Sequence, residues 1–180
     1  MRRSIMISSL VAIAIVLALS LFLATRHPIT GADEANTALL GKPAPRLEGV
    51  RLGAETSINL RHDLGHIVVV NFWASWCGPC KSEAPNLSTF AWQERKHNVD
   101  VIGVVFDDPI GDAEAFARYY GSLYPSVIDP AGEIANRYGV ISPPTTFIIN
   151  AKGVVEASLI GPVSTAQLED AVSKVRTSSP

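Results

Sequence analysis

The stretch from Val68 to Pro85 reads Val-Val-Val-Asn-Phe-Trp-Ala-Ser-Trp-Cys-Gly-Pro-Cys-Lys-Ser-Glu-Ala-Pro. Its first residues form an apolar run rich in β-branched side chains, which is typical of a strand buried on both faces. Small and polar residues follow, and the chain from about Cys77 to Lys96 has the pattern of a helix. The stretch therefore predicts a strand, a tight turn and a helix that begins with a Cys-x-x-Cys pair.

The predicted position of the two cysteines suits a reactive thiol. The unpaired backbone N–H groups in the first turn of a helix point at the first cysteine, and the helix dipole favours a negative charge there. The i, i+3 spacing of Cys77 and Cys80 puts both sulfurs on one face, close enough to bond without moving the backbone. A thiol in such a setting has its pKa lowered, commonly to about 3.5–7.5. We interpret the pair as a redox-active dithiol.

Two other interpretations of the cysteine pair are less favoured. A structural zinc site needs four ligands, but Cys77 and Cys80 are the only cysteines, and the four histidines show no paired ligand spacing. We therefore expect no metal. A purely structural disulfide would normally close a longer loop, because the entropic gain grows with loop size.

The segment from Phe72 to Lys81, Phe-Trp-Ala-Ser-Trp-Cys-Gly-Pro-Cys-Lys, closely resembles the active-site motif of thioredoxin. Thioredoxin has a buried aspartate at the position of Asn71. Its replacement, together with the pattern Cys-x-x-Cys-x-x-Glu-x-Pro that ends at Pro85, is similar to the TlpA/ResA/CcmG (DsbE) group of extracytoplasmic thiol–disulfide oxidoreductases. The resemblance extends over about residues 41–175.

The resemblance implies an α/β, thioredoxin-like fold with a central mixed β-sheet and helices on both faces. The pattern of the chain itself predicts an N-terminal β-hairpin from 47–50 and 56–59, and alternating strands and helices after it. The resemblance also implies a central insertion of a helix and a strand, for which we expect a helix over 112–120 and a strand over 126–128. Phe116, Tyr119 and Tyr120 are predicted to form the core of this insertion rather than a ligand site.

The N-terminal segment is predicted to lie outside the fold. Arg2 and Arg3 precede an uncharged run over 5–24, about the 20 residues that a helix needs to cross a bilayer. We favour an uncleaved anchor, with the rest of the chain exported according to the positive-inside rule. A cleaved signal and a secreted product are the alternative, although the only candidate cleavage site, Thr30-Gly31-Ala32, is weak.

The predicted organisation is a membrane anchor or signal at 1–24, a linker at 25–40, the thioredoxin-like domain at 41–176 and a tail at 177–180. A net charge of -2 gives no basis for binding nucleic acid.

Thiolate chemistry suggests a role for each cysteine. Cys77, nearer the helix start and solvent, is predicted to attack a substrate disulfide, and Cys80 is predicted to resolve the mixed disulfide. Gly78 would remove side-chain bulk from the contact surface and Pro79 would stiffen the turn. Trp76 either flanks the thiol with an exposed edge or has an ordinary packing role.

Glu83 has two interpretations. Glutamate in a helix is usually solvated. The resemblance instead implies a partly buried carboxyl near Cys80 that manages the proton of this thiol, and we favour this role because the aspartate that helps in thioredoxin is absent at Asn71.

The resemblance also implies a cis-proline before a strand that begins near residue 145. Pro144 matches that position, so we expect a cis peptide although trans is the general rule. The residue before the cis-proline usually offers both N–H and C=O to an extended substrate. Here it is Pro143, which has no N–H, so strand-like capture of a substrate should involve one fewer hydrogen bond.

The favoured function is a membrane-anchored reductant of disulfides in exported proteins, without an organic cofactor. By resemblance, its substrates would be the haem-binding cysteines of apocytochrome c, and a membrane electron-transfer protein of the CcdA/DsbD type would reduce it. A disulfide-forming oxidant remains an alternative. A thioredoxin-like peroxidase is disfavoured because the chain lacks the Thr-x-x-Cys arrangement, and a redox-silent module is disfavoured by the intact cysteine pair.

Overall fold

The computed structural model describes residues 15, 16, 18 and 37–178. Contacts divide the chain into two units, residues 1–30 and 31–180. In the first unit Ile15, Val16 and Ala18 are helical. Most of the predicted anchor, and the linker up to residue 36, lie outside the described residues. Among those that are described, no helix has both the length and the apolar character that a membrane span requires.

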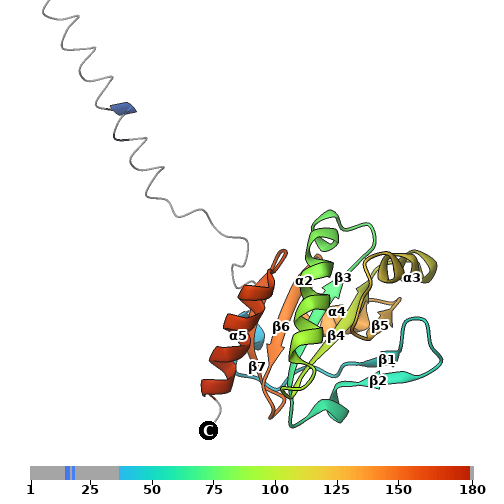
Figure 1. Cartoon of the computed structure of the whole chain (residues 1–180), viewed down its shortest axis with the longest axis horizontal. Coiled ribbons are helices and arrows are strands. Elements are labelled where there is room, and N and C mark those ends of the chain that lie inside the picture. Colours follow the sequence, from blue (N-terminus) through green and yellow to red (C-terminus); the bar gives the residue numbers. More distant parts are fainter. Residues whose placement is uncertain (1–14, 17, 19–36, 179–180) are drawn as a thin grey trace, which may run out of the picture. The chain divides into compact units, whose positions relative to one another are not determined.

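A five-stranded sheet forms the centre of the second unit, in the order β5-β4-β3-β6-β7 (Figure 1). β3 (Ile67–Trp73) lies in the middle, parallel to β4 (Val99–Phe106) and antiparallel to β6 (Thr145–Ile149). β5 (Ser126–Asp129) pairs in parallel with β4, and β7 (Val155–Ile160) pairs antiparallel with β6. The mixed sheet confirms the predicted fold class.

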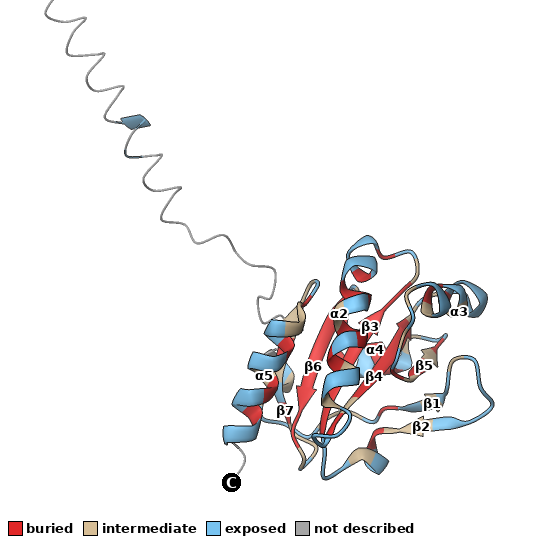
Figure 2. Ribbon diagram, viewed as in Figure 1, coloured by how far each residue is buried: buried red, intermediate tan, exposed pale blue. Residues whose placement is uncertain are grey.

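All seven residues of β3 are buried, as its apolar run predicts. Alternate side chains point to opposite faces of the sheet. Val68 and Val70 pack in one cluster with α4 (Glu133–Tyr138), whereas Ile67 and Val69 pack in another with α2 (Gly78–Glu94) and α5 (Thr165–Ser178). Figure 2 shows the buried strands between the exposed outer faces of these helices.

The elements outside the central layers also match expectation. β1 (Glu48–Val50) and β2 (Ser57–Asn59) form the antiparallel N-terminal hairpin, and a 3₁₀ turn (Leu60–Asp63) leads to β3. Another 3₁₀ turn, Thr37–Leu39, precedes the hairpin. The predicted insertion is present as α3 (Ile110–Tyr119) and β5.

The prediction of three core aromatic residues in the insertion is wrong for one of them. Phe116 is buried, its ring stacks on Trp73 with centroids 4.9 Å apart, and Tyr120 contacts Phe116. Tyr119, however, is 82% exposed. Ala113, Phe116 and Tyr120 recur at i, i+3 and i+7, which defines one helix face, and Tyr119 lies beside that face at the end of α3.

Candidate active site

The two cysteines lie at the start of α2, just after the turn that follows β3. They form a disulfide with sulfurs 2.01 Å apart. Cys77 is the N-cap residue of α2, and its Sγ accepts a hydrogen bond of 3.1 Å from the backbone N–H of Cys80. An N–H group and the helix dipole therefore both act on the sulfur of Cys77. These are the features that stabilise a thiolate once the disulfide is reduced.

The two cysteines differ little in their access to solvent. Cys77 is nearer the helix start, as expected, but it is only slightly nearer solvent in this oxidised form, with 4% of its surface exposed against 2% for Cys80. Both pack against an apolar cluster that includes Trp73, Val105 and Phe116. The difference between the sulfurs is thus electrostatic, since Cys77 receives the hydrogen bond at the start of the helix.

Three predicted substrate-contacting residues surround the disulfide at the surface. Trp76, Gly78 and Pro79 are exposed, and Trp76 keeps 55% of its surface accessible. A Cβ atom added at Gly78 would meet no atom within 4 Å, so a side chain there would project outward. The indole of Trp76 is also anchored, because its Nε1 donates a hydrogen bond of 2.9 Å to the carbonyl of Asp107. Trp76 is therefore both exposed and anchored to the loop after β4, and its contact with a substrate stays a prediction.

The peptide bond between Pro143 and Pro144 is cis, as expected. Pro144 is buried and its carbonyl accepts a hydrogen bond from the N–H of Gly161. The register of β6 on β3 sets Thr145 opposite Phe72, which brings Pro144 toward the end of β3, from which the chain continues to Cys77. The roles of Pro143 and Pro144 in substrate binding stay predictions.

Glu83 is 1% exposed, so it is fully rather than partly buried and is not a solvated helix residue. Its Oε1 accepts a hydrogen bond of 3.2 Å from the N–H of Val163, and its Oε2 accepts one of 3.3 Å from Nδ2 of Asn71. Burial disfavours the charged form and raises the pKa of Glu83 from its ordinary value of 4.5 to about 7, although both hydrogen bonds lower it. The carboxyl therefore titrates near neutrality.

Several partners of the site could not be identified from the motif. Asn71 Nδ2 also donates to Oγ1 of Thr146 on β6, at 3.0 Å. Asp108, just after β4, accepts hydrogen bonds from both the N–H and the hydroxyl of Ser75. The position of Asp108 just after β4 could have indicated that it lies near the cysteines, which follow the parallel strand β3. The carboxyl ends of neighbouring parallel strands meet at one edge of a sheet, where sites form.

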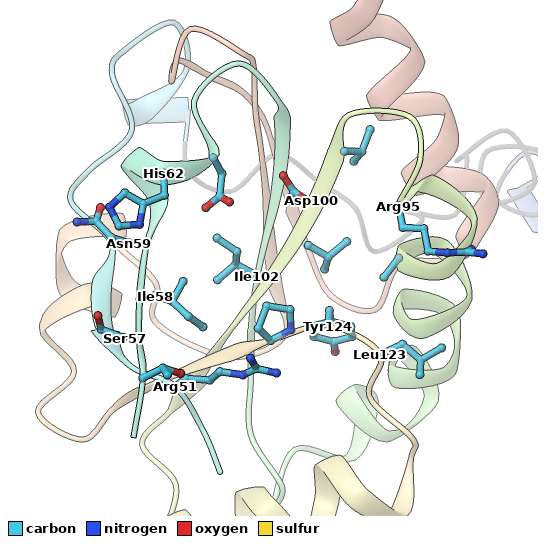
Figure 3. A pocket seen from close by; sticks show the side chains of 16 residues that line it. Arg51, Ser57, Ile58, Asn59, His62, Arg95, Asp100, Ile102, Leu123 and Tyr124 are labelled. Atoms are coloured by element: carbon cyan, nitrogen blue, oxygen red, sulfur yellow. The ribbon is translucent and has the colours of Figure 1, made fainter. Parts of the chain in front are cut away.

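A pocket of about 340 Å³ lies elsewhere in the domain (Figure 3). Its lining includes Val99 to Ile102, which pair with the start of β3, whereas the disulfide follows the end of that strand. None of the predicted site residues lines it. Across the described part of the chain, no group of three or more His, Cys, Asp or Glu side chains has the arrangement of a metal site.

Comparison with known proteins agrees with this geometry. Residues 40–158 match the AhpC/TSA family. The chain is 36% identical over 142 residues to the thiol:disulfide interchange protein HelX of Rhodobacter capsulatus, covering 77% of this chain and 75% of HelX. It is 32% identical over 136 residues to the thiol-disulfide oxidoreductase ResA of Bacillus thuringiensis, covering 76% of this chain and 78% of ResA. A secreted thiol-disulfide isomerase from Corynebacterium glutamicum has a similar structure, with a TM-score of 0.70, 25% identity, and 83% and 95% of the two chains covered.

Proposed function

Since the chain belongs to the AhpC/TSA family and is a thiol–disulfide oxidoreductase of the HelX, ResA and DsbE type, we propose that it reduces disulfides of exported proteins. The observation that carries this proposal is the Cys77–Cys80 disulfide at the start of α2, with a backbone N–H on the sulfur of Cys77. The exposed Trp76, Gly78 and Pro79 beside it provide a surface on which a protein substrate can dock.

The proposed reaction begins with the reduced pair. The Cys77 thiolate attacks one sulfur of a substrate disulfide, forms a mixed disulfide and releases the other substrate sulfur as a thiolate. The Cys80 thiolate then attacks the sulfur of Cys77 and releases the second substrate thiolate. Two electrons have passed to the substrate, and the protein is left with the Cys77–Cys80 disulfide seen in this structure.

Cys80 must lose its proton before it can resolve the mixed disulfide. We propose that Glu83 accepts this proton, because it lies three residues further along α2 and its pKa of about 7 suits proton transfer at neutral pH. Its hydrogen bonds go to Val163 and Asn71, so the transfer would follow a rearrangement of the carboxyl or pass through a water molecule.

The proposed location is the outer side of a cell membrane. The uncharged run over 5–24 behind Arg2 and Arg3 supports an anchor, residues 25–40 a linker and residues 41–176 the domain. The similar structure from Corynebacterium glutamicum is described as secreted. Because exported compartments are oxidising, a reductant there needs continuous electron supply, for which we propose a membrane electron-transfer protein of the CcdA/DsbD type.

The proposed substrates are the two haem-binding cysteines of apocytochrome c, in oxidised form. The experiment incubates the reduced Cys80→Ser variant with an oxidised Cys-x-x-Cys-His peptide and follows the mixed disulfide by mass spectrometry. We expect trapping by Cys80→Ser and none by Cys77→Ser, because only Cys77 attacks. Trapping by Cys77→Ser instead would overturn the assignment of the nucleophile, and equal trapping of an unrelated disulfide peptide would remove the claim of this substrate.

A further inference from the structure

Asp108 contacts the segment that precedes the reactive cysteine. Its Oδ2 accepts a hydrogen bond of 2.6 Å from the N–H of Ser75, and its Oδ1 accepts one of 2.8 Å from the hydroxyl of the same residue. Both oxygens of one half-buried carboxylate therefore hold a single residue, two positions before Cys77. Hydrogen bonds to a charged acceptor are among the stronger ones, so this contact restrains the turn between β3 and α2.

The neighbouring residue adds a third restraint. Asp107 accepts a hydrogen bond on its carbonyl from the indole of Trp76, and its backbone has a φ of +42°. Few residues other than glycine adopt positive φ, although aspartate does so more readily than most. This backbone turn presents the carbonyl of Asp107 to Trp76 and the carboxylate of Asp108 to Ser75. Asp107 and Asp108 thus restrain both residues that directly precede Cys77, Ser75 and Trp76.

The charge of Asp108 has a second consequence. The carboxylate of Asp108 is bonded to Ser75, and at most about 7 Å separates the Cα atoms of Ser75 and Cys77, which are two residues apart. A negative charge held beside this turn opposes formation of a second one on the sulfur of Cys77. It acts against the N–H of Cys80 and the helix dipole, which favour the thiolate.

The charged residues on the elements that adjoin the turn before Cys77 are few. The first half of α2 carries the exposed Lys81 and the buried Glu83, and the loop after β4 carries Asp107 and Asp108. The segment 141–146, which includes the cis-proline, contains no charged residue. Asp108 is the charged group whose side chain is bonded directly to the turn before Cys77.

We propose that Asp108 is a positioning residue for thiol–disulfide exchange, which fixes the turn through Ser75 and, by its charge, disfavours the Cys77 thiolate. This deepens the proposed function and rests on it for its biological meaning, because a less stable thiolate makes the reduced pair a better electron donor. A protein that keeps its nucleophile less acidic in this way is suited to reduce substrates rather than to oxidise them.

The test is Asp108→Asn, which removes the charge while its amide oxygen can still accept one hydrogen bond from Ser75. In a Cys80→Ser background, alkylation of Cys77 by iodoacetamide, a neutral reagent, should reach its pH midpoint at lower pH. In the protein with both cysteines, equilibrium with glutathione should shift about three- to tenfold toward the reduced form, the size expected for loss of one charge held near the sulfur in a partly solvated site. Asp112→Asn, an exposed residue in the first turn of α3, is the charge-matched control and should change neither quantity.

Ser75→Ala separates the two effects of Asp108. It removes the hydroxyl bond but retains the charge and the backbone bond, so it should leave the alkylation midpoint near that of the wild type. If Asp108→Asn does not fold, Asp108→Ser replaces it as the neutral variant. The proposal would be overturned if the acid dissociation constant of Cys77, from the alkylation midpoint, and the equilibrium constant with glutathione both stayed within twofold of the wild-type values. Equal shifts in Asp112→Asn would also overturn it. Both measurements are independent of the substrate, so they can succeed even if reduction of exported proteins is not the function.

Discussion

Asn71 Nδ2 lies 3.3 Å from Oε2 of Glu83, and both side chains are buried, at 0% and 1% exposure. At the position where thioredoxin has a buried aspartate, this chain has the amide of Asn71. This amide donates a hydrogen bond to a carboxyl on α2. Asn71 cannot take up a proton, but it donates a hydrogen bond that favours the charged form of Glu83. Under the proposed mechanism, the group that accepts the proton of Cys80 is therefore Glu83 on α2, three residues after that cysteine.

Glu83→Gln should slow the resolution of the mixed disulfide while leaving the first attack by Cys77 unchanged. Glutamine fills the same volume and its oxygen can accept a hydrogen bond, but it cannot accept the proton of Cys80. We expect a loss of about 10²-fold in the rate of decay. In the wild type the rate should rise with pH around 7, where Glu83 becomes charged. Stopped-flow measurement of mixed-disulfide decay checks this.

The control for this experiment is Glu55→Gln, which changes an exposed glutamate in the turn of the hairpin. Its mixed disulfide should decay at the wild-type rate. Equal decay rates of Glu83→Gln and wild type at every pH between 5 and 9 would show that Glu83 does not act on Cys80.

Glu83 should also make the oxidised protein less stable as the pH rises. Its pKa is 4.5 ordinarily and about 7 in the fold, so between these values the folded state binds more protons than the unfolded state. The free energy of unfolding therefore falls as pH rises through this window. The full loss is about 3 kcal/mol, since each pKa unit corresponds to about 1.4 kcal/mol.

Glu83→Gln removes this dependence. Its free energy of unfolding in guanidinium chloride should therefore increase relative to the wild type between pH 4 and pH 8. A stability difference between the two proteins that stays constant over this range would mean that the carboxyl titrates at its ordinary pKa in the fold.

Asn71→Leu should move the pH midpoint of resolution upward. The substitution keeps a similar volume but removes the N–H group that stabilises the charged form of Glu83. Thr146→Val is the matched comparison, because it removes the other acceptor of Asn71 Nδ2 while leaving the donor to Glu83 in place. The measurement is the pH profile of mixed-disulfide decay, and an identical midpoint in Asn71→Leu and wild type would exclude this role for the amide.

The elements around the cysteines could be predicted because each has a strong local signal. The apolar run from Val68 predicted a buried strand, and the structure has β3 there, over Ile67–Trp73. The cis peptide at Pro144 and the buried state of Glu83 came from the resemblance, since neither follows from local pattern. The actual partners of Glu83 lie 12 and 80 residues away, and no local rule predicts such pairs.

Close contacts between side chains and backbone in the core could not be predicted from the sequence either. Gly103 on β4 lies so near the indole of Trp73 that an added Cβ would come within 2.6 Å of Nε1. This Nε1 donates to Ser126 on β5, so three neighbouring strands meet beneath the active site. Glycine within a strand signals a close approach, but it does not identify the approaching residue. The wrong prediction that Tyr119 is a core residue has a similar cause, because aromatic character alone does not tell which side of a helix end is buried.

The equilibrium reduction potential of the Cys77–Cys80 pair, measured by titration in glutathione buffers, tests the proposed direction of electron transfer most directly. We predict a value near that of thioredoxin, about −270 mV, against about −120 mV for a strong oxidant. This gap of about 150 mV corresponds to about 7 kcal/mol for a two-electron couple, so the titration separates the two cases. A potential near −270 mV would agree with a reductant, and a potential above about −180 mV would contradict it.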